Sequence, residues 1–307
     1  GPRLLPTARV ERVLHQAGRV TGVDGVRVDP VTGAATGSLR VQAAVVCVAA
    51  GVLDTPALLL RSGLAGTQHT AGAQLQFHTS THVTARFPFP IHGYYGPTMA
   101  FAVEELSDVH GHRGPGVMIE NTAAHPLATA TALAGIGREH EQAIHDITHL
   151  ARALVVIHDR ARGDVTVNGA STKIRYTPGP DDWERLRQGM IAAARVYLAA
   201  GATEVYLPLH GTAPVRRDSD LGTVRNLPLD ATCFTLLYAV HLFGGAVMAS
   251  EPARGFCRED GRAWDTDGLY VSDAACLPSC LGINPQITIV ANALRIADGI
   301  VTARRHA

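Results

Sequence analysis

His241, in the run HLFGG, and Asn284, in the run GINPQIT, are the two side chains of this sequence best suited to proton chemistry at a bound substrate. Imidazole titrates near neutral pH, and a carboxamide both donates and accepts hydrogen bonds. Asn284 and Pro285 also have the residue types of a helix N-cap and a first helical position. Because a helix N-terminus stabilises negative charge, we expect a base and a hydrogen-bond partner beside an anion-stabilising helix end.

The elements around these residues follow from their apolar pattern. The run GLYVSD, residues 268–273, predicts an apolar strand that ends in an acid. After Pro285, apolar residues recur close to a 3.6-residue period, which predicts a helix. The recurring residues are Ile287, Val290, Leu294, Ala297 and Val301.

Three separate blocks, HLFGGAVM, GLYVSDAACLP and GINPQIT, resemble in order and spacing the C-terminal signature of the glucose–methanol–choline (GMC) flavin oxidoreductases. Since the second site residue is Asn284 rather than histidine, the resemblance is nearest to the long-chain alcohol oxidase and cholesterol oxidase branches. It implies FAD as cofactor and hydride transfer from an alcohol carbon to the flavin. It further implies His241 as the base for the hydroxyl proton, Asn284 as the holder of the substrate oxygen, and a hydrophobic alcohol, long-chain or sterol-like, as substrate.

The resemblance also implies where the cofactor lies. Val10, in the run LLPTARVERVL, would lie against the adenine end of the cofactor, and Ala50 and Gly51, in the run VVCVAAGVLDTPALLLRSG, near its phosphates. Taken alone, this segment is explained better by ordinary sheet core and a tight turn. The glycines of HLFGG would keep the backbone small beside the isoalloxazine. The residues expected to contact FAD are Val10, Ala50, Gly51, Asp273, Ala274, Pro285 and Gln286.

No GxGxxG run follows a strand anywhere in the chain, and this run forms the usual cradle for a dinucleotide pyrophosphate. We therefore expect the C-terminal part of an FAD-binding domain whose N-terminal Rossmann unit is missing. A separate N-terminal FAD-binding half is then a candidate partner. The expected fold class is α+β (mixed α/β), with an antiparallel-sheet substrate domain at 71–238 inserted between FAD-binding parts at 1–70 and 239–307.

Along the chain, strands are predicted at Ala8–Leu14 and Arg19–Val28, and a helix at Pro56–Ser62. The nearly continuous apolar run Val41–Val48 predicts a strand covered on both faces, with Cys47 buried in it. Five aromatic residues cluster within positions 87–101 and suggest either an apolar substrate lining or plain core. They are Phe87, Phe89, Tyr94, Tyr95 and Phe101.

In the middle of the chain, residues 139–157 predict an amphipathic helix that carries His145 and His149 at a spacing able to hold a metal. The zinc-protease pattern requires a glutamate after the first histidine, but Asp146 stands there and no third ligand follows at the expected distance. We therefore expect no metal site. Further histidines scattered over strands and loops read as structural or surface residues: His78, His82, His92, His110, His112 and His125.

Residues 164–176 predict a hairpin with its turn at Asn168-Gly169, and Asp182–Ala199 predicts a helix stopped by Gly201.

Composition excludes several classes of function. The 27 basic and 27 acidic residues give zero net charge, so nothing favours nucleic acid or an anionic membrane surface. No run of 18 apolar residues occurs, so no transmembrane helix is predicted. Five cysteines without a CxxC pair favour a reducing, cytoplasmic compartment.

Three functions are therefore compared. The leading one is an FAD-dependent oxidoreductase that oxidises an alcohol to an aldehyde or ketone. The alternative is a truncated, non-catalytic flavin-fold fragment that needs a separate N-terminal half. A metal hydrolase that uses His145 and His149 comes last.

Overall fold

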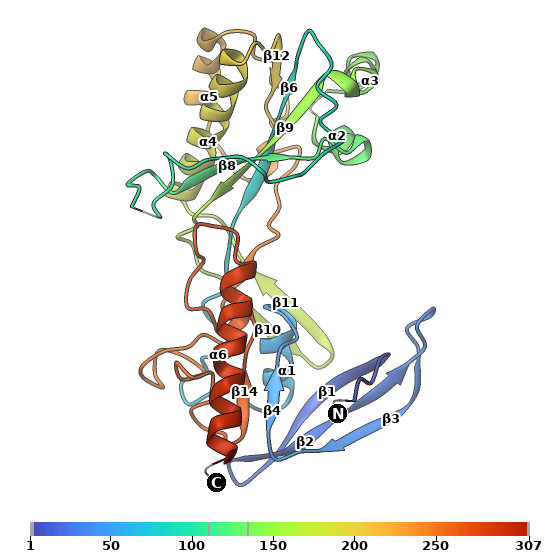
Figure 1. Cartoon of the computed structure of the whole chain (residues 1–307), viewed down its shortest axis with the longest axis vertical. Helices are drawn as coiled ribbons and strands as arrows, with labels where there is room; N and C mark the ends of the chain where they lie inside the picture. Colours follow the sequence, from blue (N-terminus) through green and yellow to red (C-terminus); the bar gives the residue numbers. More distant parts are fainter. Residues whose placement is uncertain (1–2, 110, 134, 306–307) are drawn as a thin grey trace.

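The computed structural model describes residues 3–109, 111–133 and 135–305, and two lobes stacked along the long axis of the molecule are evident in Figure 1. The upper lobe is built on a five-stranded sheet, and the lower lobe carries both termini. This mixed α/β architecture agrees with the fold class expected from the sequence.

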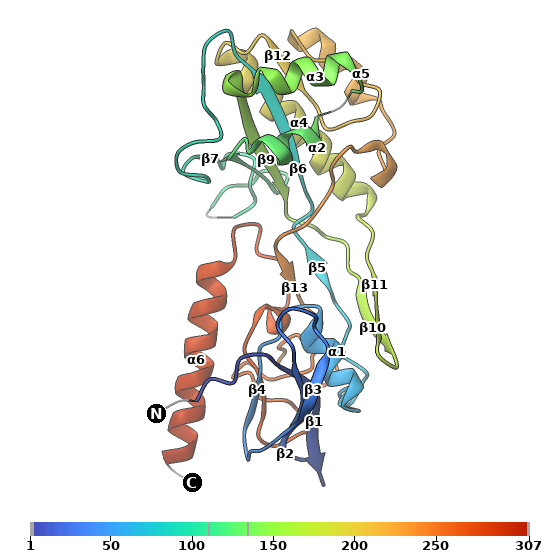
Figure 2. The same ribbon diagram turned by 90° about the vertical axis from the view of Figure 1, so that its right-hand side faces the viewer.

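The sheet of the upper lobe is antiparallel throughout, as expected for the substrate domain. Its strands in spatial order are β12 (Glu204–Tyr206), β6 (Ser80–Arg86), β9 (Leu150–Ile157), β8 (Val117–Thr122) and β7 (Ala102–Val103). Strand β6 begins and strand β9 ends on the side of the sheet that faces the lower lobe (Figure 2), so residues there are available to a site between the lobes.

Helices cover both faces of this sheet (Figure 1). The predicted helix is confirmed as α4 (Pro180–Ala199), which packs Leu186 and Met190 against the apolar face. Gly189 permits the close approach, since a Cβ there would lie 2.3 Å from Cγ1 of Val155. The short helix α5 (Gly222–Arg225) lies on the same side, whereas α2 (Pro126–Ala132) and α3 (Arg138–His145) cover the other face.

The predicted helix over residues 139–157 is wrong in its second half. Helix α3 ends at His145, a 3-10 turn spans Ile147–His149, and the chain then enters β9. Strand β9 pairs with β6 on one side and with β8 on the other, and almost every residue of β9 is buried. The branched apolar residues of β9 suit this central position. His145 and His149 therefore share no helix face, and Nδ1 of His149 is bonded to the carbonyl of Phe87.

The first two strands of the lower lobe are confirmed as β1 (Ala8–Gln16) and β2 (Arg19–Val28), which form an antiparallel sheet with β3 (Ala35–Gln42). The single strand expected at 41–48 is wrong. Its first residues end β3, and only β4 (Val46–Val48) continues, in parallel with β14 (Leu269–Val271). Because β14 is the only strand hydrogen-bonded to β4 among the described residues, one side stays uncovered and Cys47 is exposed.

The next elements lie beside this pair. Helix α1 (Asp54–Arg61) matches the predicted helix, and the predicted hairpin is formed by β10 (Asp164–Asn168) and β11 (Ser171–Arg175). The hairpin loop is Gly169-Ala170, one residue later than expected. The guanidinium of Arg61 donates to the carbonyl of Ala170 and to Thr172, so the hairpin packs on the lower lobe although it falls within the range predicted for the substrate domain.

The last helix, α6 (Gln286–Arg305), stands along the outside of the lower lobe (Figure 2). Only Ile296 is fully buried in it. Ile287, Val290 and Leu294 of the periodic set are 83%, 53% and 62% exposed. The period therefore predicts the helix correctly, but its apolar face points away from the rest of the described chain.

Candidate functional site

His241 lies immediately before a short strand that fixes its position. Strand β13 (Leu242–Phe243) pairs antiparallel with β5 (Gln76–Phe77), and the N–H of His78 donates to the carbonyl of His241. This pairing places the two imidazoles side by side, with Nδ1 of His78 3.2 Å from Nδ1 of His241. The rings meet edge to face, their centroids 5.3 Å apart.

His78 also connects His241 to the loop before α6. The N–H of Gly282 donates to Nε2 of His78 over 2.9 Å, and Asn284 follows two residues later. One fully buried histidine, expected from the sequence to be structural, therefore contacts His241 directly and the backbone of the loop that carries Asn284.

Asn284 is oriented by the upper lobe. Its Nδ2 donates to Oε1 of Glu120, on β8, over 2.8 Å, and lies 4.0 Å from Sδ of Met99. The amide is thus turned toward the sheet and away from the capping position expected for it. Oδ1 of Asn284 and Oε2 of Glu120 are buried without a partner among the described residues. Two unsatisfied polar atoms at one place are costly in a core and typical of a site that receives a ligand.

Burial sets the charges at this site. It lowers the pKa of His241, and it lowers the pKa of His78 to about 3, with a smaller contribution from repulsion by His241 and His158. Both imidazoles are therefore neutral near pH 7. Burial also raises the pKa of Glu120, against the hydrogen bond from Asn284, which lowers it.

Two of the residues expected to contact the cofactor share a hollow of about 1110 Å³ in the lower lobe. Val10 and Ala50 line it between β1, α1 and the β10–β11 hairpin, together with Arg9, Arg12 and Arg61. Val10 is 38% exposed, so its side chain is accessible from this hollow.

The turn after β4 is held from the far end of the chain. Asp273 accepts hydrogen bonds from the N–H of Gly51 over 2.7 Å, from Oγ1 of Thr55 over 2.6 Å and from the N–H of Ala275 over 2.9 Å. The carbonyl of Ala274 accepts from the N–H of Gly244. Asp273 therefore organises the predicted phosphate turn, with its carboxylate occupied by protein donors.

The remaining predicted cofactor residues stand at the start of α6. Pro285 is buried just before the helix, and Gln286 is its exposed first residue. The fold itself requires a glycine at position 244 of the HLFGG run, whether or not a cofactor is bound. Gly244 has a φ of +82°, and a Cβ there would lie 2.0 Å from the carbonyl oxygen of Gln74.

Most of the aromatic residues suggested as a lining are exposed and not enclosed in a pocket, although the rings of Phe87 and Phe89 lie 5.5 Å apart. Phe87 belongs to the core beneath α4. The others are on the surface, with exposures of 49% for Phe89, 41% for Tyr94, 87% for Tyr95 and 79% for Phe101.

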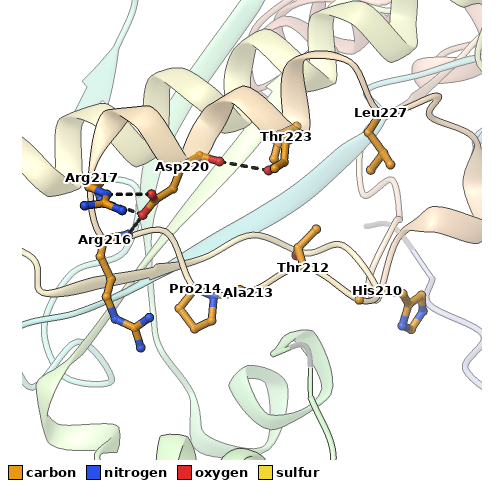
Figure 3. A pocket seen from close by; sticks show the side chains of 11 residues that line it. His210, Thr212, Ala213, Pro214, Arg216, Arg217, Asp220, Thr223 and Leu227 are labelled. Atoms are coloured by element: carbon orange, nitrogen blue, oxygen red, sulfur yellow. Dashed lines mark hydrogen bonds and ion pairs between the residues drawn. The ribbon is translucent and has the colours of Figure 1, made fainter.

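A second hollow, drawn in Figure 3, has a volume of about 750 Å³ and lies in the upper lobe near α5. Its lining includes neither His241 nor Asn284. The charged groups in it are already paired, since Asp220 accepts from Arg217 (Figure 3) and the guanidinium of Arg216 pairs with Glu204. It offers no free ionic group to chemistry.

His78 and Glu120 are the residues that sequence reasoning missed. Each lies on or next to a strand of the middle segment, 163 and 164 positions away from the residue it contacts. No local motif marks them; the pairing of β5 with β13 and the position of β8 bring them to the site.

Metal chemistry receives no support from the side chains that the structure describes, which hold no group of three or more potential ligands. His110 lies outside the described residues. Within the same residues, no helix is both long and apolar enough to span a bilayer.

Comparison with known proteins gives two family matches, both described as GMC oxidoreductase. The N-terminal family model matches residues 1–80 and the C-terminal model matches residues 159–293. The expected loss of an N-terminal Rossmann unit is therefore not confirmed.

Among curated proteins, an uncharacterised GMC-type oxidoreductase of Mycobacterium tuberculosis is 34% identical over 98% of this chain and 46% of its own length. A long-chain-alcohol oxidase of Arabidopsis thaliana is 26% identical over 92% of this chain and 39% of its own length. The chain thus spans less than half the length of each of these two relatives.

Solved structures show the same fold. Pyridoxine 4-oxidase from Mesorbium loti superposes with a TM-score of 0.64 at 19% identity, over 95% of this chain and 57% of that one. Aspergillus oryzae formate oxidase, in a study of its FAD modification, gives 0.67 at 15% identity, over 98% and 61%.

Proposed function

Because this chain belongs to the GMC oxidoreductase family, whose cofactor is FAD, we propose that it forms the substrate-facing part of an FAD-dependent enzyme that oxidises CH–OH groups. The observation that carries the proposal is the linkage of His241 and Asn284 through His78 and Gly282. His78 thereby contacts the ring of His241 and the backbone of the loop that carries Asn284, 43 positions further along the chain. Activity of the whole protein is part of the proposal, since the relatives are about twice as long.

The residues present fit the cofactor. The hollow beside Val10 and Ala50 is lined by apolar side chains that suit a base, by three arginines and by the acids Glu11 and Asp54. Arg9 pairs with Glu11 and Arg61 holds the hairpin, so Arg12 is the guanidinium of the three that has no partner among the described residues and can meet phosphate charge. Gly51, with a φ of +90°, has open space where a Cβ would point, so its backbone can approach a ligand closely. Ala274 lies beside the HLFGG loop, while Pro285 and Gln286 place the positive end of α6 next to Asn284.

The chemistry divides between cofactor and protein. Bound FAD supplies the hydride acceptor that no amino-acid side chain provides. We propose that His241 and Asn284 hold the alcohol oxygen and fix its approach, while the hydroxyl proton passes to a base, the role predicted for His241. Glu120 and Met99 enclose Asn284 from the upper lobe.

A hydrophobic alcohol, long-chain or sterol-like, stays the predicted substrate. The names of the Arabidopsis long-chain-alcohol oxidases support it, whereas the aromatic residues suggested as a lining, most of them exposed, lend no support. No comparison supports a separately supplied N-terminal half, and the cytoplasmic location stays a prediction.

The test combines flavin binding with turnover. Purified protein is titrated with FAD, and alcohol-dependent flavin reduction is followed for the wild type, His241→Ala, Asn284→Ala and the control His210→Ala, whose side chain is exposed on the upper lobe. We expect flavin binding in all four and a loss of roughly 10²-fold or more in kcat/KM for the two site variants only. Absence of flavin binding would favour the non-catalytic fragment, and full turnover of His241→Ala would exclude the proposed site.

A further inference from the structure

We propose that His78 is a positioning residue that fixes the tautomer of His241, so that Nε2 of His241 carries the proton and faces the substrate as a hydrogen-bond donor. The inference rests on the proposed function for its meaning, because it assigns the role of His241 at the alcohol oxygen. The tautomer itself is a property of this chain alone. It follows from two hydrogen bonds and the rule that a neutral imidazole has one donor and one acceptor nitrogen.

The first hydrogen bond fixes His78. A backbone N–H can only donate, so Nε2 of His78, 2.9 Å from the N–H of Gly282, must present its lone pair. A neutral His78 therefore carries its proton on Nδ1. The ring cannot rotate out of this arrangement freely, because it is fully buried and packs against Phe243, with ring centroids 4.9 Å apart.

The second hydrogen bond passes the constraint to His241. Nδ1 of His78 bears a proton and lies 3.2 Å from Nδ1 of His241, which must therefore accept. If Nδ1 of His241 also carried a proton, two N–H groups would point at each other. The single proton of neutral His241 is consequently on Nε2.

Charging either ring does not relieve the constraint. Burial opposes an imidazolium at His78, and the neighbouring His241 and His158 oppose it further by repulsion. A proton on Nδ1 of His241 would meet the N–H of His78, and burial, which lowers the pKa of both rings, keeps them neutral near pH 7.

This tautomer decides what His241 does to a substrate. Nε2–H donates to the alcohol oxygen, and the bond strengthens as negative charge grows on that oxygen. The base role predicted for His241 requires the opposite tautomer, with the lone pair on Nε2. With Nε2–H in place, the alcohol's own hydroxyl proton leaves to a water molecule, and His241 keeps its proton and stabilises the oxygen. The two roles are distinguishable, because glutamine keeps an N–H donor near the position of Nε2 and cannot act as a base.

The direct test is nitrogen NMR of the chain labelled with 15N-histidine, without flavin or substrate. Protonated and lone-pair nitrogens of neutral imidazole resonate far apart, and His241→Gln and His78→Asn assign the two rings. We expect protons on Nδ1 of His78 and Nε2 of His241. A His241 signal with the proton on Nδ1 would overturn the proposal.

Matched variants of His78 test its role. His78→Asn keeps an amide donor near the position of Nδ1, whereas His78→Phe keeps ring volume without a donor. We expect the Nε2–H tautomer of His241 to persist in the asparagine variant and a mixture of tautomers to appear in the phenylalanine variant. An unchanged His241 spectrum in a folded His78→Phe protein would contradict the assignment, and the wild-type spectrum decides alone if that variant does not fold.

Turnover separates donor from base. If His241 donates, His241→Gln should keep a kcat/KM at least roughly tenfold above that of His241→Ala, the value of one hydrogen bond to a developing charge. Equal losses in both would favour the base. Failure of the proposed function would show as absence of turnover in the wild type, and the NMR result would still stand.

Discussion

Asn284 donates a hydrogen bond of 2.8 Å to the carboxylate of Glu120, and this bond joins the start of α6 to strand β8 of the upper lobe. Glu120 is only 5% exposed, and its second oxygen has no partner among the described residues. The side chain proposed to hold the substrate oxygen is therefore itself held by a buried acid. Glu120 acts through Asn284 in this arrangement, which makes it a positioning residue.

Replacing Glu120 tests this role. Glu120→Ala removes the acceptor and frees Asn284 to rotate, so we expect kcat/KM to fall by roughly tenfold or more. Glu120→Gln retains an amide oxygen that accepts the same bond and should recover most of the loss. The measurement is flavin reduction by alcohol, with thermal unfolding of both variants as control. Equal losses at equal stability would show that the charge of Glu120, and not its bond to Asn284, is what matters.

Local sequence patterns predict much of this fold for physical reasons. The hairpin at residues 164–176, the end of α4 before Gly201 and the strand β2 with its valines are each determined within a few residues, although the hairpin loop lies one residue later than expected. The residues 150–157 are the counterexample. Their apolar run suits a buried helix or a buried strand equally well, and only pairing with β6 and β8 selects the strand.

The site likewise contains residues that local sequence patterns reveal and residues that only the folded chain reveals. His241 and Asn284 stand in runs that the sequence displays directly, whereas His78 and Glu120 are recognisable only once distant strands have paired. Asp273 lies between these cases. Its place at the end of an apolar strand is legible in the sequence, but its partners Gly51 and Thr55 are 222 and 218 positions away.

Asp273 should be needed for the turn after β4. Asp273→Ala leaves two backbone N–H groups and the hydroxyl of Thr55 without their acceptor, so we expect the free energy of unfolding to fall by about 2 kcal/mol or more. Asp298→Ala, at an exposed position of α6, is the control and should change it by less than about 0.5 kcal/mol. Denaturant unfolding measures both. A stability loss no larger than that of the control would mean that other contacts hold the turn.

Gly244 should tolerate no side chain. Its φ of +82° is unfavourable for other residues, and a Cβ would lie 2.0 Å from the carbonyl oxygen of Gln74, which is backbone and cannot move aside alone. We expect Gly244→Ala to lower the free energy of unfolding by roughly 3 kcal/mol or more and to displace the neighbouring His241. Gly37→Ala, where nothing lies within 4 Å of the new atom, is the matched control. Similar melting temperatures for the two variants would contradict the prediction.

Asp159 should make stability depend on pH. It is 1% exposed and accepts from the N–H and hydroxyl of Thr79 and from the hydroxyl of Tyr176. Burial, partly offset by these bonds, raises the pKa of Asp159 from 3.8 to about 7. A carboxyl group whose pKa is higher in the folded state binds its proton more tightly there. Its contribution to stability is therefore full below about pH 4 and is lost as the pH rises through about 7.

Asp159→Asn removes this titration while keeping a planar side chain of similar size. Between about pH 4 and pH 7, the unfolding free energy of the wild type should fall relative to that of the variant, by up to roughly 4 kcal/mol. Urea unfolding at several pH values measures the difference, with Asp298→Asn as an exposed control that should follow the wild type. Parallel pH profiles for the wild type and Asp159→Asn would show that the buried carboxylate ionises at its ordinary pKa, with its three donors compensating for the lost hydration.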